Sequence, residues 1–194
     1  MIPLGKLSKK EINDLPLKSY RGKIFIINSP EDVESVCTSL QKETVLGFDT
    51  ETRPVFIKGD HHPPSLIQMA GQKAVYIFQL SQTGLCQPII NLLSSDKIVK
   101  CGVAINQDLR ELNLVKHFTP RCFVDLGEIA RKSFIPHHGL RGLAAYFLGF
   151  RISKQARITN WNVVNLSKKQ ITYAATDAWV GRELFFKFKE ESLI

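Results

Sequence analysis

The sequence predicts an α/β domain with a central mixed β-sheet of about five strands and α-helices on both faces. Short apolar runs of strand length alternate with longer amphipathic stretches, and helical patterns dominate after the last run. Alternation of strands and helices favours parallel pairing. A Gly71-Gln72 turn between two runs predicts an antiparallel hairpin, so the sheet is expected to be mixed.

The first half of the chain supplies most of the sheet. Residues 23–27 are a strand candidate, and Ser29 and Pro30 provide an N-cap and a first-turn proline for a helix over residues 31–41. The first three sheet strands are then expected at residues 44–48, 65–70 and 73–78.

The second half adds two strands and most of the helices. A helix over 85–93 leads to the fourth sheet strand at 98–101, and a helix over 106–115 leads to the fifth at 122–125. Ser167 and Gln170 form a capping box. The remaining helices are expected at residues 126–132, 140–148 and 167–189.

Length and composition indicate one folded unit. The 194 residues, 44% of them hydrophobic, can bury a full core. Residues 1–20 are polar, basic and weakly patterned, so they are expected to form an N-terminal extension to a single domain over 21–194. No helicase domain or accessory helical domain is expected.

The charge balance favours an anionic partner. Lys and Arg number 26 against 18 Asp and Glu, a formal charge of +8. Such a field attracts polyanions such as nucleic acid, although it also serves solubility alone. Four cysteines without zinc spacing indicate a reduced intracellular setting, the cytoplasm or, in a eukaryote, the nucleus. No membrane-length or signal segment is seen, so no membrane partner is expected.

An acid pair ends the strand at residues 44–48. Asp49 and Glu51 are two residues apart, which places both side chains on one face of an extended chain. Ligands of α/β sheets gather at the carboxyl ends of strands, although a pair of loop-start acids is the alternative. A second Asp-x-Glu, Asp32 and Glu34, falls in the first turns of a predicted helix, where acids favour the helix N-terminus.

Two further acids lie on predicted helix faces. Asp108 shares a stripe with Leu109 and Leu112, although an early-turn acid explains it as well. Tyr173 and Asp177 are four residues apart and share a face of the last helix, where a simple tyrosine–aspartate hydrogen bond is the alternative. Together these acids can converge on one point, and oxygen ligands select Mg²⁺ or Mn²⁺.

The acid-bearing segments resemble the DEDDy branch of the 3′–5′ exonucleases, similar to ribonuclease D and to the Werner syndrome helicase exonuclease domain. No phosphate-binding loop, dinucleotide fingerprint or nucleophile elbow competes with this resemblance. The matching segments are residues 47–51, 64–68, 100–109 and 170–178, with Asn160 and Trp161 upstream of the last. Relatives often carry Ser or Asp where this chain has Asn160.

The resemblance implies a ribonuclease H-like fold and two-metal phosphodiester hydrolysis from a 3′ end of DNA or RNA, releasing nucleoside 5′-monophosphates. It assigns two Mg²⁺ or Mn²⁺ ions to the site. Tyr173 would orient the attacking water. The implied metal ligands are Asp49, Glu51, Asp108 and Asp177.

Substrate contacts and substrate type stay open. Phe56 and Lys58 lie in the loop that follows the first acid pair and would contact the terminal nucleotides of a single strand. Trp161 is either a base platform or a packing residue. Ribonuclease D-like trimming of RNA 3′ ends and a non-catalytic nucleic-acid-binding module are alternative functions. The oligomeric state is undetermined, and a monomer is compatible with the sequence.

Overall fold

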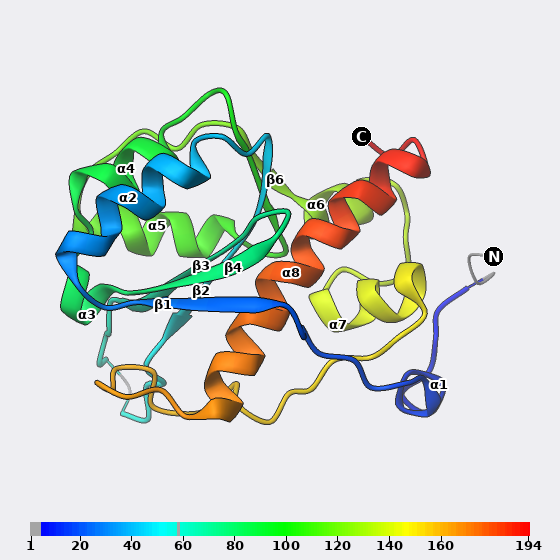
Figure 1. Cartoon of the computed structure of the whole chain (residues 1–194). Coiled ribbons are helices and arrows are strands. Elements are labelled where there is room, and N and C mark those ends of the chain that lie inside the picture. The colour runs from blue at the N-terminus through cyan, green and yellow to red at the C-terminus, as the bar shows by residue number, and fades with distance from the viewer. Residues whose placement is uncertain (1–4, 58) are drawn as a thin grey trace.

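The protein folds around a six-stranded mixed sheet with the strand order β1-β4-β3-β2-β5-β6. The computed structural model describes residues 5–57 and 59–194 (Figure 1). β3 pairs antiparallel with both β2 and β4, and the other pairings are parallel, so the prediction of a mixed sheet containing a hairpin is confirmed. The strands are β1 (Lys23–Ile27), β2 (Val45–Thr52), β3 (Pro64–Ala70), β4 (Ala74–Gln79), β5 (Val99–Gly102) and β6 (Phe123–Asp125).

The sheet has six strands where about five were expected, because the strand candidate at residues 23–27 joins it. The additional strand is β1, which pairs in parallel with β4 at the edge of the sheet, with Lys23 opposite Ala74. Exposed and covered side chains alternate along β1, as in an edge strand with one solvated face. Its partner lies about 50 residues away in the sequence, and no local pattern reveals that pairing.

Helices cover both faces of the sheet, as predicted (Figure 1). One apolar cluster joins α2, α4 and α5 to one face, and two further clusters join α6, α7 and α8 to the other. The helices are α1 (Lys9–Asp14), α2 (Pro30–Leu40), α3 (Leu80–Thr83), α4 (Gln87–Leu93), α5 (Asn106–Val115), α6 (Leu126–Lys132), α7 (Leu140–Leu143), the π-helix η1 (Ala144–Leu148) and α8 (Lys168–Glu190).

Two helix boundaries differ from the expectation. The helix expected over 85–93 begins at Gln87, because Cys86 is an extended N-cap residue and Pro88 lies in the first turn. The helix expected over 140–148 changes from α to π geometry at Ala144. The capping box of α8 is present, with the Ser167 hydroxyl accepting a hydrogen bond from the Gln170 amide.

The contact between α8 and β2 determines the geometry of the site. A Cβ atom on Gly47 would lie 2.0 Å from the Ala178 carbonyl oxygen, so only glycine allows this approach. Small residues of α8, including Ala174 and Ala178, face the sheet with less than 1% exposure. The helix backbone therefore lies directly against the strand that carries Asp49.

The segment before β1 crosses α8 on its way to the sheet (Figure 1). The amide of Lys18 donates to the Arg151 carbonyl at 2.9 Å, and the amide of Tyr20 donates to the Thr176 hydroxyl at 3.0 Å. These contacts hold residues 17–20 beside the first half of α8. Within the described part of the chain, no helix is long and apolar enough to cross a membrane.

Candidate active site

β2 carries the first acid pair on the face that is covered by α8. Gly47, Asp49 and Glu51 alternate with Phe48 and Thr50 along the strand. Since Gly47 contacts α8, its alternate neighbours Asp49 and Glu51 point to the same side, while Phe48 joins the core on the opposite face. The buried apolar residues before Asp49 form the strand that aims both carboxylates at α8.

α8 brings the third carboxylate to this pair. Asp177 is 8% exposed, and one oxygen from each of Asp49, Glu51 and Asp177 lies within 4.8 Å of the others. The Asp177 Oδ1 atom is buried and has no hydrogen-bond partner among the described residues. Three carboxylates this close, one with an orphaned oxygen, are a suitable ligand set for a hard cation.

Asp108 approaches from α5, on the other face of β2. The Thr50 hydroxyl donates to Asp108 Oδ1 at 2.5 Å, which ties the start of α5 to the strand. Asp108 is half-buried and lies outside the group of three carboxylates, yet its charge contributes to the raised pKa of Asp49. The structure therefore brings all four acids to the end of β2, with Asp108 at the margin.

Burial raises the pKa of every carboxyl in this group, and the charges of neighbouring acids add to the shift at Asp49, Glu51 and Asp108. Burial is the main cause at each, and it raises the pKa of Asp108 to about 6, of Asp177 to about 7 and of Glu51 to about 10. Asp49 also has a pKa well above its usual range, from burial and from the charges of Asp177 and Asp108. Without a cation, the cluster therefore resists ionisation.

We expect the metal-free protein to lose stability as the pH rises from about 4 to about 8. These carboxyls bind protons more tightly in the folded state than in the unfolded chain, so folding takes up protons in this window and the free energy of unfolding falls. Each proton of difference gives a slope of about 1.4 kcal/mol per pH unit. Denaturant titrations in EDTA at several pH values measure it.

The Asp49→Asn variant serves as the control for this pH dependence. It removes one member of the cluster and leaves other titrating groups, such as the buried His137, unchanged. Its slope is expected to be shallower than that of the wild type. Added Mg²⁺ or Mn²⁺ should stabilise the wild type more at pH 8 than at pH 5.5, because cations bind ionised carboxylates. If the free energy of unfolding in EDTA instead rose between pH 5 and 8, and by the same amount for the wild type and for Asp49→Asn, the expectation would be wrong.

Tyr173 lies one helical turn before Asp177. Burial is the main cause of its raised pKa, followed by the negative charges of Asp177 and Glu51. The phenol is thus held neutral beside the carboxylates and can donate a hydrogen bond. The ring of Tyr173 lies 5.9 Å from the ring of Trp161, centroid to centroid.

The three residues expected to contact substrate differ in where the structure places them. Phe56 is 83% exposed in the loop after β2, where its ring is free for stacking. Lys58 lies outside the described residues. Trp161 is only 1% exposed and packs in the core beneath Tyr173, so its ring presents no open face to a base, and the packing alternative holds.

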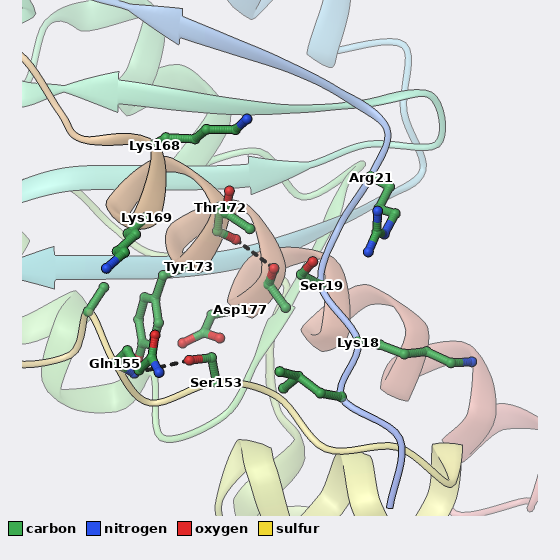
Figure 2. Close-up of a pocket in the computed structure, with 13 residues that line it drawn as sticks. Lys18, Ser19, Arg21, Ser153, Gln155, Lys168, Lys169, Thr172, Tyr173 and Asp177 are labelled. Carbon is green, nitrogen blue, oxygen red and sulfur yellow. Dashed lines mark hydrogen bonds between the residues drawn. The ribbon is translucent and has the colours of Figure 1, made fainter.

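Two cavities with basic walls flank Tyr173 and Asp177, which line both. A cavity of about 470 Å³ lies between α8, the segment before it and residues 17–21, and Figure 2 shows Lys18, Arg21, Lys168 and Lys169 around it. A second cavity of about 370 Å³ is lined by Arg141, Lys154 and Arg157, among others. The charge of Arg157 partly offsets the raised pKa of Glu51.

The N-terminal segment contributes to these cavities, which its sequence did not predict. Lys18 and Arg21 lie in or next to a stretch that was expected to be an extension. The basic composition of that stretch was the one feature of the sequence that pointed to a role for these two residues. Composition does not show that the Leu17 backbone pairs with Arg151, and this pairing places the segment beside α8.

A mixed sheet covered on both faces, with carboxylates converging at the end of an inner strand, defines a ribonuclease H-like domain with an acidic centre that could bind metal. The particular family follows from comparison. A profile described as 3′–5′ exonuclease matches residues 24–192, and the chain belongs to this family.

Relatives of known sequence are longer proteins. The chain is 28% identical to the mouse bifunctional 3′–5′ exonuclease/ATP-dependent helicase WRN over 187 residues, covering 90% of this chain and 13% of that protein. It is 33% identical to mouse exonuclease 3′–5′ domain-containing protein 2 over 158 residues, covering 75% and 24%. Ribonuclease D of Bartonella henselae is 27% identical over 194 residues, covering 96% and 46%. The chain thus spans less than half the length of each.

Solved structures share the fold. The EXO domain of Nibbler from Aedes aegypti has a TM-score of 0.78 and 21% identity, covering 90% of this chain and 92% of that one. Escherichia coli RNase D has a TM-score of 0.76 and 20% identity, covering 89% and 47%. The prediction of a ribonuclease H-like fold is confirmed.

Proposed function

We propose that this protein is a metal-dependent 3′–5′ exonuclease of the DEDDy type, which hydrolyses phosphodiester bonds at the 3′ end of a nucleic acid strand. The observation that carries this proposal is the convergence of Asp49, Glu51 and Asp177 within 4.8 Å, with Tyr173 on the same helix as Asp177. Family membership supports the reaction class.

The carboxylates would hold two cations, Mg²⁺ or Mn²⁺. Asp49, Glu51 and Asp177 form the close group, and Asp108, at the margin, would ligate through a water molecule. The cations would lower the pKa of a bound water and offset negative charge on the entering and leaving oxygens. Their charge also removes the repulsion that raises the pKa of the free carboxyls.

Tyr173 would orient the attacking water. Its raised pKa makes the phenol a poor base at neutral pH, so its part is to hold the water by a hydrogen bond in line with the scissile bond. The reaction adds this water across the P–O3′ bond, and the leaving strand retains the 3′-oxygen as a hydroxyl. The product is a nucleoside 5′-monophosphate.

We expect Tyr173→Phe to lower kcat by about 100-fold while leaving the affinity for Mn²⁺ within about twofold of wild type. The substitution removes the hydroxyl and keeps the ring that packs on Trp161, so the fold is retained. Single-turnover cleavage and Mn²⁺ titration measure the two quantities. If kcat and the affinity for Mn²⁺ fell by the same factor, the hydroxyl would belong to the groups that hold the metal.

The cavities beside Tyr173 and Asp177 provide positive charge for the strand. Lys18, Arg21, Lys168 and Lys169 surround one of them, and Lys154 and Arg157 line the other. Phosphate groups are attracted to such surfaces in a salt-dependent manner. Phe56, exposed beyond β2, would stack on a terminal base.

Cleavage assays on end-labelled single-stranded DNA, recessed duplex DNA and RNA, each with Mg²⁺ or Mn²⁺, test the proposal. Stepwise shortening from the 3′ end is expected on at least one substrate. A related structure is that of Trypanosoma brucei RNase D with RNA U12, so ribonuclease D-like RNA trimming is a specific arm of the assay. Strand binding that is insensitive to EDTA, with no cleavage of any substrate, would instead favour a non-catalytic binding module.

A further inference from the structure

Gln68 of β3 is a buried amide without a partner. Its side chain is 0% exposed, and neither Nε2 nor Oε1 has a hydrogen-bond partner among the described residues. An unsatisfied buried polar group destabilises the fold, because it has given up its hydrogen bonds to water. Native proteins rarely keep such groups unless a water, an ion or a functional role accounts for them.

Gln68 lies directly beside the proposed metal centre. In the antiparallel pairing of β2 and β3, Gln68 is opposite Asp49. Opposed residues share a face of the sheet, with Cβ atoms about 4.5–5.5 Å apart. This is the face covered by α8, because Gly47 contacts Ala178 on it. Gln68 is therefore the side chain next to Asp49 on the adjacent strand.

The surroundings of Gln68 limit what its amide can contact. Its alternate neighbours on β3, Leu66 and Ala70, are apolar and buried with the alanines of α8, and Ile77 is opposite it on β4. Asp49 is the ionisable side chain directly opposite Gln68, and Glu51, opposite Leu66, is the next one along the same face of β2. The directly opposed neighbour that can accept a hydrogen bond from this amide is thus the Asp49 carboxylate.

We propose that Gln68 is a positioning residue for the metal centre, whose Nε2 donates directly or through one buried water to the Asp49 carboxylate when cations are bound. This inference rests on the proposed function. A neutral donor holds the carboxylate in one orientation without adding another negative charge. A glutamate at this position would instead increase the repulsion within the cluster.

The Gln68→Met variant separates positioning from packing. Methionine keeps an unbranched side chain of similar length and removes both polar atoms. We expect its dissociation constant for Mn²⁺, measured by electron paramagnetic resonance, to rise about 10-fold or more, as for the loss of other groups that orient metal ligands. The melting temperature in EDTA should stay the same or rise, because no unsatisfied amide remains. Gln68→Leu tests the same point with another apolar shape.

Met69→Leu is the matched control, since Met69 is the adjacent residue of β3, is equally buried and faces the opposite core. It should leave Mn²⁺ affinity within twofold. Unchanged affinity in both Gln68 variants would overturn the inference, as would a loss of affinity that accompanies an equal loss of stability in EDTA. Wild-type protein that binds no Mn²⁺ would overturn the proposed function itself, whereas tight wild-type binding that Asp49→Asn abolishes would leave that function standing.

Discussion

Replacing Asp49 with asparagine is expected to lower the rate of 3′-end cleavage by about 1,000-fold or more. Asp49 belongs to the close carboxylate group and its pKa also responds to the charge of Asp108, so in the proposed site it would hold metal together with the other acids. Metal charge supplies several kcal/mol of transition-state stabilisation. Each 1.4 kcal/mol corresponds to about tenfold in rate, so its loss gives the stated factor.

The same substitution should stabilise the metal-free fold at neutral pH. Burial and the charges of Asp177 and Asp108 make the ionised Asp49 carboxylate unfavourable, and asparagine removes that charge while keeping the shape. Activity and stability therefore move in opposite directions. Gel-based cleavage assays with Mn²⁺ measure the activity, and denaturant unfolding in EDTA measures the stability.

Asp32→Asn provides the control within the chain. Asp32 and Glu34 repeat the Asp-x-Glu spacing, but they are exposed on α2, which packs on the face of the sheet opposite to α8. Cleavage by this variant should stay within about twofold of wild type. If Asp49→Asn retained wild-type cleavage, the carboxylate group would not be the catalytic centre. If it lost activity together with its fold, the loss would carry no information on metal binding, and Asp177→Asn would provide the same test from α8.

Gly47→Ala is expected to destabilise the protein by about 3 kcal/mol or more, the upper range for overpacked cores. The added Cβ would lie 2.0 Å from the Ala178 carbonyl oxygen and 3.0 Å from the Arg182 Cβ, and backbone atoms cannot rotate out of its way. α8 would have to move away from β2. For a domain of this size the melting temperature would fall by about 6–12 °C.

This displacement should also weaken metal binding, because α8 carries Asp177 toward Asp49. Gly139→Ala is the control: a Cβ there meets nothing within 4 Å, and its φ of −97° suits alanine. It should change stability by less than about 1 kcal/mol. A Gly47→Ala protein as stable as Gly139→Ala would show that the interface between α8 and β2 adapts without cost. Thermal unfolding in EDTA and Mn²⁺ titration give both results.

The local sequence was sufficient to place most elements. The apolar run before Asp49 and the hairpin around Gly71 appear as predicted, as does the capping box at Ser167. Each depends on neighbouring residues alone, through strand burial, turn chemistry or helix capping. The spacing of Tyr173 and Asp177 on one helix is local in the same way.

Long-range pairing was not available from the sequence. The edge strand β1 joins the sheet by pairing with β4. The N-terminal segment reaches the site because Leu17 forms a backbone bridge with Arg151. The burial of Trp161 was also undetermined, because an aromatic residue before a helix can face either the core or a ligand.

The sequence by itself determined the α/β class and the placement of the acids at a strand end and on helix faces. Both depend on periodicity and capping, which are encoded within a few residues. Only the tertiary structure decided that Asp49, Glu51 and Asp177 lie within 4.8 Å while Asp108 lies at the margin. That distance depends on the close approach of α8 to Gly47, a contact between segments about 130 residues apart. The partnerless amide of Gln68 likewise became visible only once β3 was paired with β2.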